Sequence, residues 1–191
     1  MVAGLSIAGM LGLLLFTLAR QAPVRPAAAS MLASGTPSAG ESPPDLSKMS
    51  PRERFNRLYN RVMQAAQAGD EATVARFTPM ALTAYEMLDT LDADARYHAA
   101  LLRAHTGEVE SARALGDSIL ARNPGHLLGY VVLGTAARWR KDDEALRRAY
   151  RDFLAGYDAE MKANRPEYSE HRFSIDQFHR AAQTSPAAAG S

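Results

Sequence analysis

The stretch Tyr59-NRVMQA-Ala66 recurs with changed residues as Tyr97-HAALLR-Ala104 and as Tyr130-VVLGTA-Ala137. Each copy has a tyrosine, then apolar residues or a glycine three and four positions later, and an alanine seven positions later. These offsets place the shared residues on one face of an α-helix. The three tyrosines follow one another at intervals of similar length, so the sequence predicts three copies of one helical unit.

A second helix is expected after each copy, beyond a short turn. The three predicted turns are Gly69-Asp70, Gly107-Glu108 and Lys141-Asp142. One helix pair cannot bury its apolar side alone, so we expect neighbouring pairs to stack, with tyrosines fitting against small alanines. In the first pair, Pro79 is expected to kink the second helix at Thr78-Pro79 without ending it.

The limits of the folded region can also be predicted. Ser50-Pro51-Arg52-Glu53 is a capping box with proline at the first helical position, so the first helix should begin there. From this point to about Gln183, apolar residues recur three and four apart, which predicts helices and no strands. Asn164-Arg165-Pro166 should break the chain before an amphipathic helix from His171. That last helix either caps the open end of the stack or docks onto a partner. The prediction is a repeat domain over 50–183 and a flexible tail over 184–191.

These units resemble the tetratricopeptide repeat, whose unit of about 34 residues forms an antiparallel helix pair. The resemblance covers about residues 55–160, and its first unit is degenerate. In the third unit the matching residues are Tyr130, Leu133, Gly134, Ala137, Tyr150 and Phe153. In the second, allowing a turn one residue shorter, they are Tyr97, Ala100, Leu101, Ala104, Gly107, Ala112 and Pro124. The resemblance implies an all-α, right-handed superhelix of about three helix pairs with a C-terminal capping helix.

The resemblance also implies a binding groove, because the first helix of each pair in this family lines a concave surface that holds peptides or helices. By position from each tyrosine, the candidate groove residues are Asn60, Gln64, Gln67, His98, Leu102, His105, Val131, Thr135 and Arg138. They lack the lysine- and asparagine-rich clamp that some members use for C-terminal carboxylates. Trp139, alone among charged neighbours, is a candidate interface anchor.

Residues 1–20 are predicted to form a transmembrane anchor. Val2 to Ala19 contains no charged residue, and a helix of this length spans about 27 Å, close to the hydrocarbon thickness of about 30 Å. Gly4, Ala8 and Gly12 would form a smooth stripe for packing against another membrane helix. The alternative is a cleaved signal peptide, for which Ala27-Ala28-Ala29 offers small residues to a peptidase. Against this, the segment lacks a basic start and its apolar run is long.

The prolines, alanines and serines of residues 21–49 predict a linker rather than a fold. Two arguments about membrane orientation conflict. Arg20 and Arg25 follow the anchor, which favours a cytoplasmic repeat domain. Single N-terminal anchors followed by a tether, however, more often display their domain outside the inner membrane. We expect a single-pass protein of the inner or plasma membrane with a periplasmic repeat domain.

The sequence gives little indication of catalysis, and we expect no enzymatic activity, cofactor or bound metal. The absence of cysteine excludes disulfides, thiolate metal ligands and a cysteine nucleophile. No two histidines have the i, i+4 spacing of a helical zinc site, and phosphate-binding glycine loops are absent. Asp89, Asp92 and Asp94 are interpreted as N-caps between helices. His98 and His105 are interpreted as exposed polar surface.

The charge balance does not favour nucleic acid as a partner, because 22 basic residues face 21 acidic ones. The basic residues between Arg138 and Arg151 are interleaved with acidic ones, and Asp143–Arg147 and Glu144–Arg148 are favourable i, i+4 pairs. This pattern predicts a solvated helix face.

Together these observations predict a membrane-anchored protein–protein interaction module. It would act as a scaffold, assembly factor or accessory subunit of a membrane protein complex, for example an electron-transfer, photosynthetic or respiratory complex. The alternative is a self-associating structural homo-oligomer without a dedicated peptide ligand. Co-purifying proteins would favour the first hypothesis, and a single subunit species would favour the second.

Overall fold

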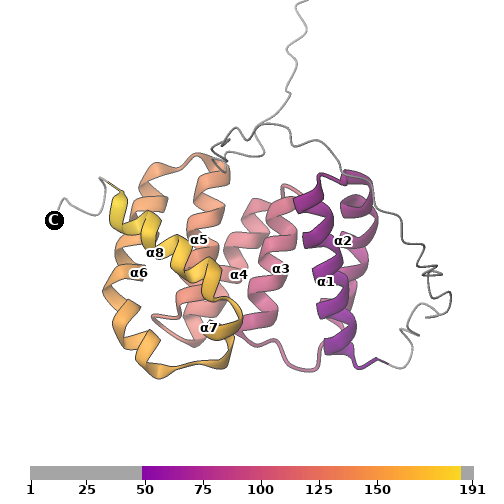
Figure 1. The fold of residues 1–191 in the computed structure, drawn as a ribbon, viewed down its shortest axis with the longest axis horizontal. Coiled ribbons are helices and arrows are strands. Elements are labelled where there is room, and N and C mark those ends of the chain that lie inside the picture. The colour runs from indigo at the N-terminus through magenta and orange to yellow at the C-terminus, as the bar shows by residue number, and fades with distance from the viewer. Residues whose placement is uncertain (1–48, 186–191) are drawn as a thin grey trace, which may run out of the picture. The chain divides into compact units, whose positions relative to one another are not determined.

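The computed structural model of the chain describes residues 49–185, and every regular element in this range is an α-helix (Figure 1). The helices are α1 (Pro51–Ala68), α2 (Glu71–Glu86), α3 (Ala93–His105), α4 (Val109–Arg122), α5 (Leu127–Arg140), α6 (Asp143–Ala163), α7 (Pro166–Glu170) and α8 (Arg172–Thr184). The all-α prediction is confirmed for this range. None of the described helices combines the length and apolar character needed to cross a membrane. The predicted anchor, most of the linker and the end of the tail lie outside the described residues.

Helices α1 to α6 form three successive hairpins whose turns share one backbone geometry. Gly69, Gly107 and Lys141 each adopt a left-handed conformation, with φ of 72°, 83° and 56°. The next amide in each turn donates to a carbonyl five positions earlier, at 2.8 to 2.9 Å. This is the Schellman pattern, which satisfies carbonyls left free at a helix end. The predicted helix–turn–helix units are confirmed.

The turns also correct the predicted register of the repeats. The second turn, at Gly107, has the same backbone bonds as the turns at Gly69 and Lys141 rather than a shorter path. Counted back from Lys141, the residue equivalent to Tyr97 in the third hairpin is therefore Val131, not Tyr130. One position corresponds to about 100° around a helix, and for this reason Tyr97 is buried while Tyr130 is only half-buried.

The capping box of α1 and the continuity of α2 through Pro79, both predicted from the sequence, are confirmed. The Ser50 side chain accepts a hydrogen bond from the Glu53 amide at 3.3 Å, and the Glu53 carboxylate accepts one from the Ser50 amide at 2.9 Å. This capping box starts α1. Helix α2 continues through Pro79 as one element. Thr78, just before the proline, is buried, and its hydroxyl donates to the Val74 carbonyl at 2.8 Å.

Two hydrophobic clusters form the core. One joins α1, α2 and α3 around Phe55 and Leu102. The other joins α3 to the C-terminal helices around Phe153 and Phe178. Buried alanines occur in both clusters, so helices approach one another closely, as the sequence predicted. Helix α4 packs along α5 far more extensively than α2 packs along α3. The second and third hairpins are therefore joined more tightly than the first and second.

Helix α8 packs across α5 and α6 (Figure 1). Its contact with α5 is centred on Gly134, where an added Cβ would lie 2.4 Å from the Phe178 ring. Only glycine allows so close an approach. The guanidinium of Arg138, one turn further along α5, lies 5.7 Å from the centre of the same ring. The face of α5 around Gly134 is thus covered by the chain itself, while Arg138 remains exposed beside it.

Hydrogen bonds at the corner between α6 and α7 connect the C-terminal helices to the start of α5. The break predicted at Asn164-Arg165-Pro166 is present, since α6 ends and α7 begins there. The buried Tyr168 hydroxyl donates to Glu160 at 2.5 Å and accepts from the Leu127 amide at 3.0 Å. Helix α5 has no side-chain N-cap of its own, so Tyr168 satisfies one of its free amides.

Candidate functional site

The structure separates the predicted groove residues into accessible and inaccessible ones. The exposed residues are Asn60, Gln64, Gln67, His105 and Arg138. Leu102 lies in one hydrophobic cluster and Val131 in the other, so neither offers its side chain to a partner. Thr135 is half-buried, and its hydroxyl donates to the Val131 carbonyl at 2.8 Å. What remains of the predicted groove is a polar strip along α1, with His105 at the end of α3 and Arg138 near the end of α5.

The corrected register gives Trp139 a defined place in the repeat. Counted from the turns, Gln67, His105 and Trp139 are equivalent residues in the last turns of α1, α3 and α5. All three are exposed, and Trp139 is 48% exposed. An exposed tryptophan at a position that recurs in each hairpin is accessible to a partner, as an interface anchor requires.

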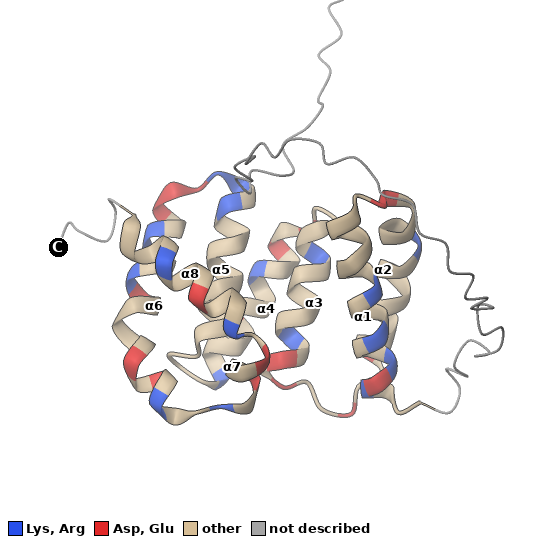
Figure 2. Ribbon diagram, in the orientation of Figure 1, with Lys and Arg blue, Asp and Glu red and all other residues tan. Residues whose placement is uncertain are grey.

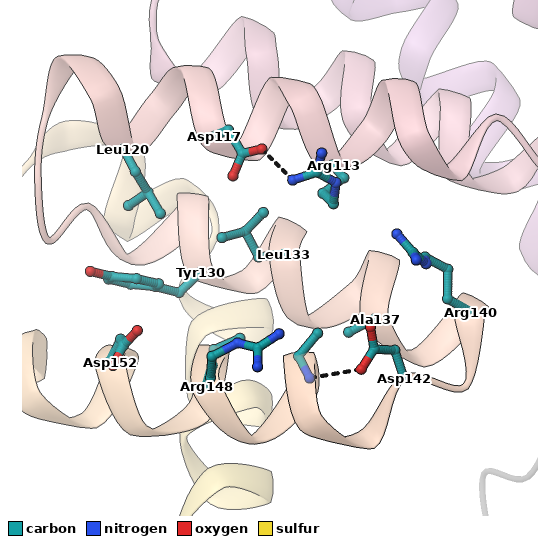
Figure 3. A pocket seen from close by; sticks show the side chains of 12 residues that line it. Arg113, Asp117, Leu120, Tyr130, Leu133, Ala137, Arg140, Asp142, Arg148 and Asp152 are labelled. Carbon is teal, nitrogen blue, oxygen red and sulfur yellow. Dashed lines mark hydrogen bonds and ion pairs between the residues drawn. The ribbon is translucent and has the colours of Figure 1, made fainter.

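A hollow of about 510 Å³ lies between α4 and α6, with α5 forming its floor (Figure 3). Its apolar part is formed by Leu120, Tyr130 and Leu133, with alanines from α5 and α6 between them. Burial raises the pKa of Tyr130, so its hydroxyl stays protonated near neutral pH and can donate or accept a hydrogen bond. The charged residues that line this groove are Arg113, Asp117, Arg140, Asp142, Arg148 and Asp152. We call this hollow the α4–α6 groove.

The arginines of the α4–α6 groove are paired with acidic residues at its rim. The ion pairs join Arg113 to Asp117 at 2.7 Å, Arg140 to Glu110 at 2.8 Å, and Arg148 to Glu144. The last is one of the two predicted i, i+4 pairs. Where α5 joins α6, a basic stretch is followed directly by an acidic one (Figure 2). Exposed pairs of this kind contribute about 0–1 kcal/mol each to stability, so a partner's charges can replace them at little cost.

The α4–α6 groove lies on the second-helix side of the hairpins, where the sequence predicted only a solvated face. Arg140 and Arg148 do reach solvent, but they flank a hollow that charge spacing alone does not reveal. The hollow exists because Ala137, Ala145 and Ala149 leave space between larger neighbours. These alanines recur on the facing sides of α5 and α6, a signal that sequence reasoning treated only as helix packing.

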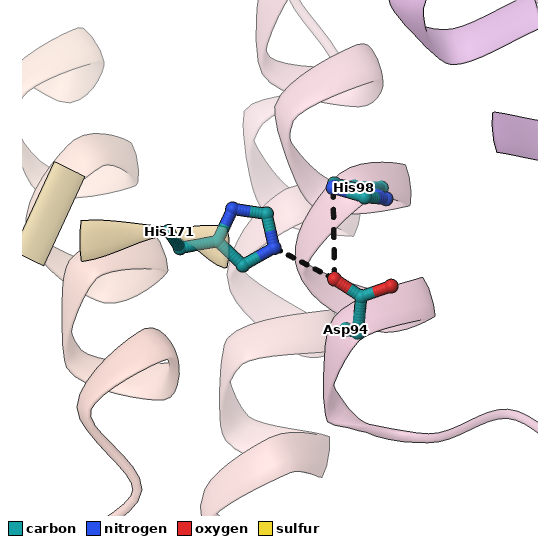
Figure 4. A group of neighbouring side chains, drawn as sticks. All are labelled: Asp94, His98 and His171. Carbon is teal, nitrogen blue, oxygen red and sulfur yellow. Dashed lines mark hydrogen bonds and ion pairs between the residues drawn. The ribbon is translucent and has the colours of Figure 1, made fainter. Parts of the chain in front are cut away.

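A second cluster of polar side chains lies where α3 meets the α7–α8 junction (Figure 4). Asp94 is in the first turn of α3, His98 is one turn later, and His171 directly precedes α8. Nε2 of His171 lies 2.7 Å from Oδ1 of Asp94, and Nε2 of His98 lies 3.6 Å from the same oxygen. The side chains of His98, His171 and Asp94 are 9%, 12% and 18% exposed.

This cluster overturns two of the interpretations made from sequence. His98 is not exposed surface, because the Tyr59 ring stacks on it with centroids 3.9 Å apart and His171 packs against its edge at 4.9 Å. Asp94 is not an N-cap, because the cap of α3 is Asp92, whose carboxylate accepts from the Ala95 amide at 2.8 Å. Asp94 is free to face the histidines instead.

The cluster has a defined charge at neutral pH. Burial lowers the pKa of His98 to about 4 despite the neighbouring carboxylate, so its imidazole is neutral. Burial alone would raise the pKa of Asp94. The hydrogen bond from His171 and the positive charge of Arg52 act against burial, and the net pKa of Asp94 lies below its ordinary value. The cluster therefore presents an ionised carboxylate beside a neutral imidazole.

The chain matches no protein-family model, and no curated protein and no solved structure is significantly similar to it.

Proposed function

We propose that the chain is a tetratricopeptide-like module that binds another protein at a membrane. It acts as a scaffold, assembly factor or accessory subunit of a membrane protein complex. In this proposal residues 1–20 anchor the module, residues 21–49 tether it on the periplasmic side, and the hairpins form a right-handed superhelix with α8 as the capping helix. The charge-free segment from Val2 to Ala19 supports the anchor.

The repeat assignment is supported by the turns rather than by the tyrosines. The interval from the second turn, at Gly107, to the third, at Lys141, matches the tetratricopeptide unit of about 34 residues. Their equivalent hydrogen bonding means that α3 is joined to α4 and α5 to α6 by turns of the same geometry. The interval from Gly69 to Gly107 is slightly longer, and this agrees with the degenerate sequence of the first unit.

The observation that carries the proposal is the composition of the α4–α6 groove. Tyrosine and arginine dominate the energetics of protein interfaces, and here Tyr130 of α5 lines the same hollow as Arg113 of α4 and Arg148 of α6 (Figure 3). Leu133 adds apolar surface beside it. Because the lining carries charges of both signs, it suits a peptide segment with apolar side chains flanked by mixed charges. A polyanion would be repelled by Asp117 and Asp152.

Site-specific photo-crosslinking in intact membranes tests this proposal. The full-length chain receives a benzophenone amino acid in place of Tyr130, and in a second protein in place of Gln64 on the polar strip of α1. After irradiation, mass spectrometry identifies what is attached. We expect the Tyr130 position to capture a distinct protein, and the Gln64 position to capture it weakly or not at all.

A matched pair of charge reversals sharpens the experiment. Arg148→Glu changes the lining of the α4–α6 groove, whereas Arg147→Glu makes the same change on the neighbouring exposed residue of α6 outside the lining. Arg148→Glu should reduce the Tyr130 cross-link and Arg147→Glu should leave it unchanged. Cross-links to a second copy of the chain alone would support the homo-oligomer instead. Capture only from Gln64 would place binding on the α1 strip and refute the α4–α6 groove.

A further inference from the structure

Three side chains able to ligate a metal converge where α3 meets the start of α8 (Figure 4). One ligand atom from each of Asp94, His98 and His171 lies within 4.8 Å of the other two. In a tetrahedral zinc site with bonds of about 2.0–2.1 Å, ligand atoms are about 3.3 Å apart. The His98–Asp94 distance of 3.6 Å already approaches this value. The His171–Asp94 hydrogen bond of 2.7 Å would open slightly as an ion replaced its proton.

His98 provides an independent observation. Its side chain is only 9% exposed and its Nε2 points at Asp94, yet 3.6 Å is too long for a hydrogen bond. Its Nδ1 is also buried and has no hydrogen-bond partner among the described residues. An ion bound at Nε2 would leave Nδ1 without a partner, so the open contact at Nε2 is the observation that indicates a ligand. An ion between Nε2 and the carboxylate would convert the open contact into a bond, and the neutral imidazole is the form that binds metals.

The ligand set and its surroundings indicate the kind of ion. Two imidazoles and one carboxylate are typical of zinc sites that keep a fourth position open. Magnesium and calcium prefer oxygen ligands throughout. A guanidinium nitrogen of Arg52 lies 3.7 Å from Oδ2 of Asp94, on the other side of the carboxylate from the imidazoles. This contact leaves Oδ1 to face the histidines, and the partial exposure of the cluster leaves room for a water molecule.

We propose that Asp94, His98 and His171 bind one divalent transition-metal ion of the zinc type, with water as the fourth ligand. The ion links α3 to the residue from which α8 starts, and so holds the C-terminal helices on the second hairpin. The three ligands lie outside α4, α5 and α6, the helices that line the α4–α6 groove. Zinc binding can therefore be tested independently of partner binding.

Zinc titration of the full-length chain tests the site. The protein is purified in mild detergent without a histidine tag, treated with a chelator, and titrated by calorimetry while thermal unfolding is followed by circular dichroism. We expect one zinc ion per chain and a rise in Tm of about 8 °C at zinc a hundredfold above its Kd. Magnesium should produce no rise. Cobalt(II) should give the visible absorption of a low-coordinate site with nitrogen and oxygen ligands.

Matched variants identify the ligands. His171→Gln should weaken zinc binding by at least about 100-fold, and Asp94→Asn, which preserves shape, should do the same. His105→Gln removes an exposed histidine from the same helix as His98 and should leave binding unchanged. Circular dichroism shows whether each variant is folded. If either His171→Gln or Asp94→Asn does not fold, zinc binding by the variant that does fold decides the test. Absence of zinc binding to the unaltered chain, or equal binding by a folded His171→Gln or Asp94→Asn variant, would overturn the proposal.

Discussion

The first and third hairpins are closed by the same turn, but their first helices end in different surroundings. Helix α1 exposes Asn60, Gln64 and Gln67 along one side. At the equivalent positions of α5, Val132 packs against Gly116 of α4 and Ala136 is buried, and α8 covers the neighbouring face at Gly134. Equal local geometry therefore does not give equal binding surfaces. At the third hairpin, the surface left open is the α4–α6 groove on the opposite side.

The two hairpins also differ in how firmly they are held. The third is packed on one side by α4 and on the other by α8, while α3 is the main neighbour of the first among the described helices. Helix α2 additionally contains Pro79, which removes one backbone hydrogen bond. We therefore expect α5, α6 and α8 to form the stable end of the domain, and α1–α2 to be its weaker end.

The largest difference should appear when one phenylalanine is removed from each end. Phe178 is fully buried against α5 and α6, so Phe178→Ala should lower the free energy of unfolding by about 3–5 kcal/mol. Phe77 is half-buried on α2, so Phe77→Ala should cost about 1 kcal/mol. Urea denaturation of the full-length variants measures both. Equal losses would contradict the view that α8 closes the stable end.

A smaller effect is expected from a single hydroxyl at the α6–α7 corner. Tyr168→Phe leaves the Leu127 amide without its buried acceptor, and leaves Glu160 with Arg165 as its remaining donor. The expected loss is about 1–3 kcal/mol. Tyr157→Phe is the matched control, since the Tyr157 ring stacks on His179 with centroids 3.9 Å apart and no described hydrogen bond involves its hydroxyl. It should change stability by less than about 0.5 kcal/mol. Similar losses from both variants would mean that Tyr168 does not cap α5.

His126, which contacts the α6–α7 corner, should make the stability of the fold depend on pH. His126 is fully buried, and burial lowers its pKa. The carboxylates of Glu167, 3.0 Å away, and of Glu160 act to raise this pKa, whereas the charge of Arg165 acts to lower it. Below pH 6.5 the unfolded chain then takes up a proton that the folded chain excludes, so stability falls as the medium is acidified. The decline between pH 7 and pH 5 should be shallower in His126→Gln, measured as Tm against pH. An unchanged slope would show that His126 does not contribute.

The turns offer the finest comparison, with effects of about 1 kcal/mol. Lys141 adopts the left-handed conformation that glycine adopts in the other two turns. Lys141→Gly should therefore raise the free energy of unfolding by about 0.5–1 kcal/mol, and Gly107→Ala should lower it by about 1 kcal/mol. Thermal unfolding of the two variants measures both. Changes of the same sign would contradict the equivalence of the turns.

The sequence predicted the features that neighbouring residues determine. The capping box at Ser50, the hairpin turns and the continuity of α2 through Pro79 depend on residues a few positions apart. The position of His98 was not predictable in this way, because its burial depends on Tyr59 and His171, far away in the chain. The register of Tyr130 was misjudged by one residue, since aligning tyrosines gives less information than the backbone bonds of the turns.

In the candidate site too, the features set by neighbouring residues were predictable and those set by packing between helices were not. Asn60, Gln64 and Gln67, which the resemblance placed in a groove, are exposed on α1, as polar residues on one side of an amphipathic helix are expected to be. Sequence periodicity could not show that α8 covers α5, or that arginines and alanines of three helices would surround one groove. Both features depend on how the helices pack across hairpins.

Residue-resolved hydrogen exchange of the full-length chain tests the central claim that α8 closes the third hairpin while the first remains open. The backbone amides of α8 should exchange slowly and together with those of α5 and α6, whereas those of α1 and α2 should open at lower free energy. Free exchange throughout α8 while α5 stays protected, or stronger protection of α1 and α2 than of α5 and α6, would contradict the account.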